Sequence, residues 1–136
     1  MKKLALVVID GMRPAAMDRA IAAGTAPTLA RLVRDGYASG ECISSFPSLT
    51  PVATSTITTG RGPHEHHVPS MHWYHRGERR YVDYGISFPA ARRSGVIGVL
   101  KDLVYRINQE HLSADTPTFF ESLEAAGVRC ACTTYM

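Results

Sequence analysis

The sequence predicts an α/β fold in which a largely parallel central sheet is flanked by helices. The run Leu4–Ile9 is continuously apolar and rich in β-branched residues, as expected of a central strand covered on both faces. Two further strand-like segments, Tyr37–Ile43 and Val128–Thr134, are separated from it and from each other by helical patterns. Strands that alternate with helices favour right-handed crossovers and therefore a mostly parallel sheet.

Two helices are expected between the first two strands. The patterns cover Ala15–Ala23 and Thr28–Arg34, and each is followed by a glycine, Gly24 or Gly36, that is typical of a helix end. Pro27 suits the start of the second helix, where its missing N–H costs no hydrogen bond.

Another helix is expected directly after Thr50. Threonine is a favoured N-cap, and Pro51 would then occupy the first helical position. The helix would cover Val52–Thr59 and end at Gly60. Its many β-branched residues have modest helix propensity, so tertiary packing has to hold it.

The remaining chain predicts one irregular segment and two helices. Arg61–Pro89 is rich in His, Arg, Tyr and Gly and is interpreted as an excursion outside the core. Val96–Asn108 carries an apolar stripe at helical spacing. Asp115–Pro117 opens a last helix, which runs to Ala126 and is stopped by Gly127.

Composition excludes several classes of protein. The 136 residues fit one domain, and 45% hydrophobic with 20% charged residues is an ordinary globular balance. A net charge of +3 suits an anionic small molecule but is too weak to indicate a nucleic-acid polymer. The N-terminal apolar run is too short for a signal peptide, and no stretch is long enough to span a membrane, so a cytoplasmic location is expected.

The cysteines do not indicate a disulfide framework. Their number is odd, at three, and Cys130 and Cys132 would face the same side of one strand. We interpret them as small buried apolar residues.

Asp10 is the first candidate site residue, because it follows a buried strand directly and precedes Gly11. Ligand sites in α/β sheets form at the carboxyl ends of strands, where a carboxylate can bind a cation. An Asx turn or a cap on the next helix is an equally good explanation of this residue taken alone.

Thr50 is the second candidate. A helix N-terminus attracts phosphate oxygens through its N–H groups and dipole. A hydroxyl there can attack phosphorus when a bound divalent metal lowers its pKa. A plain N-cap threonine is the commoner case for a single residue of this kind.

Two polar clusters could have a function, but a structural explanation is favoured for each. His64, His66 and His67 could bind a metal, but adjacent loop histidines more often make local hydrogen bonds, and that reading is favoured. The basic run formed by Arg76, Arg79 and Arg80 could steer a nucleotide, with a solvated loop as the favoured alternative.

The motifs together resemble the alkaline phosphatase superfamily, and most closely its type I phosphodiesterase/nucleotide pyrophosphatase branch. The resemblance rests on four motifs in order, Asp10-Gly11, Phe46-Pro47-Ser48-Leu49-Thr50, Thr58-Thr59-Gly60 and Pro63-His64-Glu65-His66. It implies an alkaline-phosphatase-like fold and a metal-dependent hydrolase of phosphodiester or pyrophosphate bonds.

The resemblance also assigns roles to residues. Two divalent ions are implied, zinc or alternatively manganese, with Asp10 as a metal ligand. Thr50 is the implied nucleophile and metal ligand, forming a phosphothreonine intermediate. The substrate would be a small phosphate ester such as a nucleotide, contacted near the residues Ala53, Met71, Trp73 and Tyr74.

The sequence departs from the family pattern at three points. Pro51-Val52-Ala53 replaces Phe-Pro-Asn after the nucleophile, and Met71 stands where the family has a phosphoryl-binding Asn. The family's remaining Asp and His ligands lie beyond the end of this chain. Residues 1–136 are therefore expected to form the N-terminal part of a catalytic domain that is truncated at its C-terminal end.

Two alternative functions remain open. A phosphonate or phosphomonoester hydrolase of the same superfamily would use a similar threonine, whereas the Cys-x-Pro-x-Arg type context of sulfatases is missing. The chain could instead be a catalytically incomplete α/β fragment or an interaction module. An exposed sheet edge near Val128–Thr134 would then predict self-association.

Overall fold

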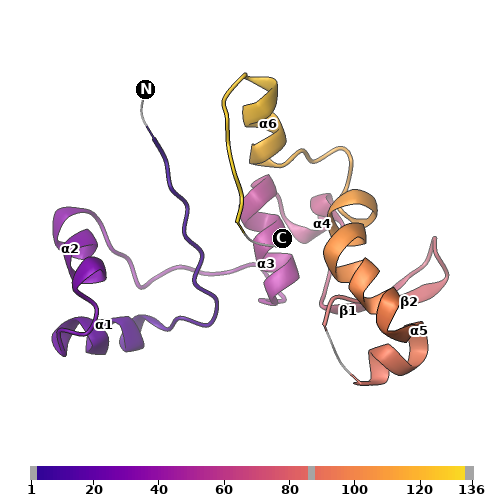
Figure 1. The fold of residues 1–136 in the computed structure, drawn as a ribbon, viewed down its shortest axis with the longest axis horizontal. Helices are drawn as coiled ribbons and strands as arrows, with labels where there is room; N and C mark the ends of the chain where they lie inside the picture. Colours follow the sequence, from indigo (N-terminus) through magenta and orange to yellow (C-terminus); the bar gives the residue numbers. More distant parts are fainter. Residues whose placement is uncertain (1–2, 86–87, 134–136) are drawn as a thin grey trace. The chain divides into compact units, whose positions relative to one another are not determined.

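The computed structural model describes residues 3–85 and 88–133 (Figure 1). The chain divides into two compact units, Met1–Ile43 and Ser44–Met136. Among the described residues, no helix is both long enough and apolar enough to cross a lipid bilayer.

The first unit contains helices α1 (Pro14–Ala22) and α2 (Pro27–Asp35), which confirms both helices predicted there. Each begins with a proline, whose fixed φ suits the first turn. Gly24 takes a φ of 72° directly after α1, a conformation that glycine adopts without strain. None of residues 3–43 is buried.

The two N-terminal strands that the sequence predicts are not formed. Leu4–Ile9 has no regular secondary structure, and Leu4 and Val7 are 94% and 76% exposed. Tyr37–Ile43 is likewise irregular and exposed. A strand exists only when a neighbour accepts and donates its backbone hydrogen bonds, and the described residues provide these segments with no such ladder.

The predicted third strand, Val128–Thr134, is not formed in the described residues either. Residues 128–133 have no regular secondary structure, and Thr134 lies outside the described residues. Cys130 and Cys132 are exposed, so their interpretation as buried residues is wrong in this structure. The sheet observed in the described residues is antiparallel and two-stranded, and the predicted parallel sheet is not seen there.

Helix α3 (Thr50–Thr59) opens the regular structure of the second unit. It begins one residue earlier than predicted, because the Leu49 carbonyl accepts the first helical hydrogen bond from Ala53 N at 2.9 Å. Leu49 is therefore the N-cap, and Thr50 is the first helical residue. Gly60 ends the helix as predicted, with a φ of 67°.

The segment predicted to lie outside the core contributes most of it. It forms α4 (Pro63–His66) and a hairpin of β1 (His72–His75) and β2 (Arg80–Asp83), in which Trp73 pairs with Val82. Because side chains alternate along a strand, Trp73 and Val82 share the inner face, and Tyr74 and Tyr81 share the outer one. The buried apolar cluster consists of Val68, Val82, Tyr84 and Ile107.

Two consecutive helical elements follow, α5 (Phe88–Lys101) and the π-helix η1 (Asp102–His111). They confirm the predicted helix Val96–Asn108 and extend it on both sides. Gly95 interrupts α5 with a φ of 70°, just before that predicted start. Of the apolar stripe, Val99 and Ile107 are buried and Leu103 is half-buried.

Helix α6 (Phe119–Ala125) is the last regular element, and it confirms the final predicted helix with a later start. Thr118 caps it. The Glu121 N–H donates to Thr118 Oγ1 at 3.3 Å, and the Thr118 N–H donates to Glu121 Oε2 at 2.7 Å. This reciprocal pair is a capping box, a stronger start signal than the Asp115–Pro117 segment.

Candidate functional site

The two residues predicted to share a metal lie in different units. Asp10 is exposed in a turn that Gly11 completes with a φ of 69°. Thr50 is half-buried in the first turn of α3, whose Pro51, Val52 and Ser55 are buried. The helix that carries the predicted nucleophile is thus anchored by packing, while the pairing of Asp10 with Thr50 stays a prediction.

The predicted substrate-binding residues have varied surroundings. The Ala53 N–H is already used inside α3, since it donates to the Leu49 carbonyl at 2.9 Å. Met71 and Trp73 pack against the buried apolar cluster. Tyr74 is 49% exposed and forms an edge-to-face pair with Tyr81. Their roles toward a substrate stay predictions.

His66 is fully buried and braces α3 from α4. Its Nδ1 accepts a hydrogen bond from the Val68 N–H at 3.1 Å, so the neutral ring carries its proton on Nε2. His66 Nε2 therefore donates to Thr56 Oγ1, at a distance of 3.2 Å between the two atoms. The Thr56 hydroxyl in turn donates to Ser45 Oγ at 3.4 Å.

Burial lowers the pKa of His66 and so favours its neutral form. The local hydrogen-bonding reading of the histidine cluster is therefore confirmed at His66. The ring fixes α3 at Thr56, within two turns of the predicted nucleophile.

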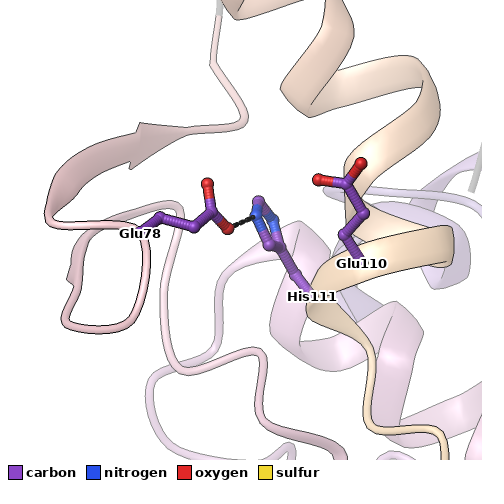
Figure 2. Close-up of side chains that lie close together, drawn as sticks. All are labelled: Glu78, Glu110 and His111. Atoms are coloured by element: carbon purple, nitrogen blue, oxygen red, sulfur yellow. Dashed lines mark hydrogen bonds and ion pairs between the residues drawn. The ribbon is translucent and has the colours of Figure 1, made fainter.

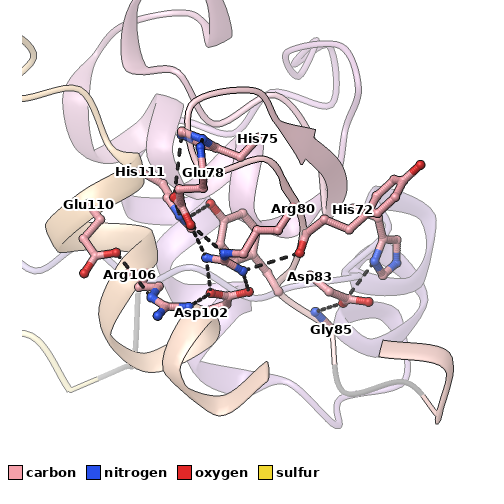
Figure 3. A network of polar contacts seen from close by, with 12 residues as sticks. His72, His75, Glu78, Arg80, Asp83, Gly85, Asp102, Arg106, Glu110 and His111 are labelled. Atoms are coloured by element: carbon pink, nitrogen blue, oxygen red, sulfur yellow. Dashed lines mark hydrogen bonds and ion pairs between the residues drawn. The ribbon is translucent and has the colours of Figure 1, made fainter. Parts of the chain in front are cut away.

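A second polar network lies between the hairpin and η1 (Figure 3). Asp102 is 1% exposed and accepts two hydrogen bonds from Arg80, at 2.7 and 2.8 Å, and one from Arg106 at 3.0 Å. Burial opposes ionisation of Asp102, but these hydrogen bonds outweigh it and hold the pKa below its ordinary value.

Arg80 therefore has a structural task that the sequence did not reveal. Its guanidinium also donates to Glu78 Oε2 at 2.6 Å. The hydrogen bonds to Asp102, above all, raise its pKa against the effect of burial. Of the basic run Arg76, Arg79 and Arg80, the last residue therefore forms ion pairs within the protein.

Three side chains of this region could hold a metal ion, Glu78, Glu110 and His111 (Figure 2). One potential ligand atom from each lies within 4.8 Å of the other two. His111 Nε2 is 2.7 Å from Glu78 Oε1, and His111 Nδ1 is 2.7 Å from the Tyr84 hydroxyl. The cluster joins the turn after β1 to the end of η1.

Electrostatics favour a carboxylate beside a neutral ring in this cluster. Burial opposes ionisation of Glu78, yet hydrogen bonds from His111 and Arg80 hold its pKa below the ordinary value. Burial lowers the pKa of His111 despite the neighbouring Glu78. Burial also raises the pKa of Tyr84, so its hydroxyl keeps its proton.

The family model for type I phosphodiesterase/nucleotide pyrophosphatase matches residues 4–136. The chain belongs to this family. The match covers nearly the whole sequence and confirms the resemblance drawn from the motifs around Asp10, Thr50 and His66. No curated protein and no solved structure matches the chain.

Family membership supports a phosphoester hydrolase at the level of the family. The matched residues include the acidic and histidine-bearing cluster of Glu78, Glu110 and His111, which the sequence did not predict. Glu78 and His111 are 33 residues apart, and Arg80 and Asp102 are 22 apart, so no local spacing could reveal either pair. The available signal was two adjacent ionisable residues, Glu110-His111, directly after an apolar helical stripe.

Proposed function

We propose that this protein contributes Thr50 as the nucleophile of a metal-dependent phosphodiester or pyrophosphate hydrolase. The observation that carries the proposal is the family match over residues 4–136, in a chain whose Thr50 occupies the first turn of an anchored helix. A helix start stabilises negative charge, which suits a residue that receives a phosphoryl group.

Thr50 would attack phosphorus through its hydroxyl oxygen, which releases its proton to solvent. A phosphothreonine forms while the bond to the leaving oxygen breaks, and solvent supplies the proton that the leaving oxygen needs. Asp10 and Thr50 supply oxygen ligands of the kind that zinc and manganese accept. Bound there, a divalent ion would lower the pKa of the hydroxyl and neutralise charge on the phosphoryl oxygens. Zinc takes four ligands or more, so the proposed pair of ions needs ligands besides these two residues.

Water would then cleave the phosphothreonine and restore the Thr50 hydroxyl. During both steps the brace through His66 and Thr56 keeps α3 in place, and so fixes the direction of the Thr50 oxygen. Ala53, Met71, Trp73 and Tyr74 are proposed to contact the substrate, a small phosphate ester such as a nucleotide.

We also propose that the apolar segments Leu4–Ile9 and Tyr37–Ile43 pair as parallel strands when both of their faces are covered. Their exposure supports this, since an apolar run of this composition is stable in water only when both faces are covered.

The test is turnover of bis(p-nitrophenyl) phosphate with zinc or manganese, in the chain and in Thr50→Ala. Thr58→Ala is the matched control, because Thr58 lies in the same helix and its hydroxyl donates to the Thr54 carbonyl at 2.9 Å. We expect Thr50→Ala to abolish turnover and Thr58→Ala to retain it.

Equal turnover in Thr50→Ala and the parent chain would refute the nucleophile. Absence of turnover in every sample would favour the catalytically incomplete fragment. A panel containing p-nitrophenyl phosphate and a phosphonate ester separates the diesterase from the monoesterase and phosphonate hydrolase alternatives.

A further inference from the structure

A cluster distant in sequence from the predicted catalytic residues has the composition of a metal site. Glu78 comes from the turn after β1, and Glu110 and His111 come from the end of η1 (Figure 2). The geometry points to a binding site for a divalent transition-metal ion of the zinc type, formed by Glu78, Glu110 and His111. It does not depend on the proposed hydrolase activity.

One side chain of the cluster has to move inward for the three to enclose an ion. The potential ligand atoms lie within 4.8 Å of one another. Two ligands of one tetrahedral zinc are about 3.4 Å apart, for bonds of roughly 2.1 Å. Glu110 can make the adjustment, because its side chain is 47% exposed.

The hydrogen bonds of His111 leave it able to bind a metal. Glu78 accepts from Nε2, so in the metal-free protein Nε2 carries the proton and Nδ1 accepts from the Tyr84 hydroxyl. A hydroxyl can also accept. When a metal takes the place of the proton on Nε2, that proton is transferred through solvent to Nδ1, which then donates to Tyr84.

His75 lies nearby and lacks this freedom. Its Nε2 is 3.7 Å from Glu78 Oε1, but its Nδ1 accepts from the Glu78 backbone N–H at 2.9 Å. A backbone N–H can only donate, so the neutral ring keeps its proton on Nε2. The partner of Nδ1 thus separates a histidine that can become a ligand from one that cannot.

A buried donor also lies next to the cluster. The Trp73 indole N–H is buried, and its nearest polar neighbour is the Tyr84 hydroxyl, with which it makes no hydrogen bond of good geometry. Trp73 lines the same cavity as Glu110 and His111 and contacts the His111 ring edge-on, with ring centroids 5.7 Å apart. Buried donors normally have a partner of good geometry, so this cavity wall has room for an additional oxygen acceptor beside the cluster.

The competing explanation is a closed network of ion pairs, because arginines already contact both carboxylates. Arg80 contacts Glu78 Oε2, whereas His111 contacts Glu78 Oε1. Arg106 lies 3.3 Å from Glu110 Oε2. A carboxylate has about four lone-pair sites, so these contacts leave room for a metal. The imidazole favours zinc over magnesium, which prefers oxygen ligands alone.

The experiment is calorimetric titration with Zn²⁺ in an Asp10→Asn/Thr50→Ala background, which removes the proposed catalytic ligands. We expect one Zn²⁺ per chain, and a loss of affinity of at least tenfold in Glu110→Gln and in His111→Gln. His75→Gln is the matched control and should bind as tightly as the background chain. Mg²⁺ should bind far more weakly than Zn²⁺.

Equal zinc affinity in Glu110→Gln and the background chain would overturn the site and leave the ion-pair network as the explanation. Glu110 decides the matter even if His111→Gln fails to fold, because its side chain is half exposed. Co²⁺ absorption separates other sites, since a thiolate charge-transfer band would assign the metal to cysteines and also overturn the proposal. Thr50-dependent turnover is measured separately, so either proposal can fail alone.

Discussion

The two units of the chain differ in how their apolar residues are used. In Met1–Ile43, no residue from 3 onward is buried, and the most apolar run of the sequence is exposed. In Ser44–Met136, a hairpin and a π-helix bury an apolar cluster and a carboxylate held by two arginines. The unit with the clearest strand motif is therefore the one with the least packing of its own.

The difference shows that motif strength and local stability are separate properties. Leu4–Ile9 and Asp10 lie within the stretch that matches the family, although none of residues 3–43 is buried. The hairpin has an unremarkable sequence but carries its own core. We expect the second unit to be sensitive to single substitutions and the first unit to be tolerant of them.

Asp102→Asn should have the largest effect. It leaves Arg80 and Arg106 without their buried partner, and breaking a buried ion pair costs about 3–5 kcal/mol of unfolding free energy. Peptide-resolved hydrogen exchange should show lost protection in β1, β2 and η1. Asp35→Asn is the control in the first unit, where the pair with Arg34 is exposed and worth about 0–1 kcal/mol. Equal losses in both variants would contradict the contrast between the units.

Acidification should have a smaller effect, again confined to the second unit. The pKa of His66 is lowered in the folded protein, so the unfolded chain takes up the proton first. The stabilisation is complete above the unfolded value of about 6.5 and is lost as the pH falls through the folded pKa. Protonation of Nδ1 would also break the bond from the Val68 N–H.

The check is the urea midpoint measured between pH 8 and pH 5. We expect it to fall with pH in the parent chain and to fall less in His66→Asn. His64, Glu65 and His67 also act electrostatically on the His66 ring, so each is kept unchanged in the comparison. A midpoint that rises on acidification would contradict the assignment of a neutral His66.

Val7→Thr should have the smallest effect. Val7 is 76% exposed, so the change is expected to alter the unfolding free energy of this chain by less than about 0.5 kcal/mol. Val82→Thr is the matched control, because the same change at a residue 1% exposed buries a hydroxyl. Thermal denaturation of both variants makes the comparison. A large loss in Val7→Thr would mean that Leu4–Ile9 is packed in solution.

The sequence predicted the helices well because their signals are local. Pro27 at the start of α2 and the glycines after α1 and α3 act within one or two turns. The strands could not be predicted in the same way, since a strand depends on a partner that can be anywhere in the chain. Leu4–Ile9 has the right composition but no partner among the described residues.

The residues of the candidate sites also differ in whether a local signal predicts them. Thr50 was placed at a helix start from the adjacent Pro51, with an error of one residue. Glu78 and His111 were missed, because only the folded hairpin brings side chains 33 residues apart into contact. The motifs around Asp10 and Thr50 identified the family even where local structure was predicted wrongly.

The position of the single tryptophan has a practical spectroscopic consequence. Trp73 packs on the apolar cluster and against His111, so its emission reports on the second unit and on the Glu78–Glu110–His111 cluster. The first unit contributes no indole signal of its own. Fluorescence of the natural chain therefore isolates one half of the molecule without any introduced label.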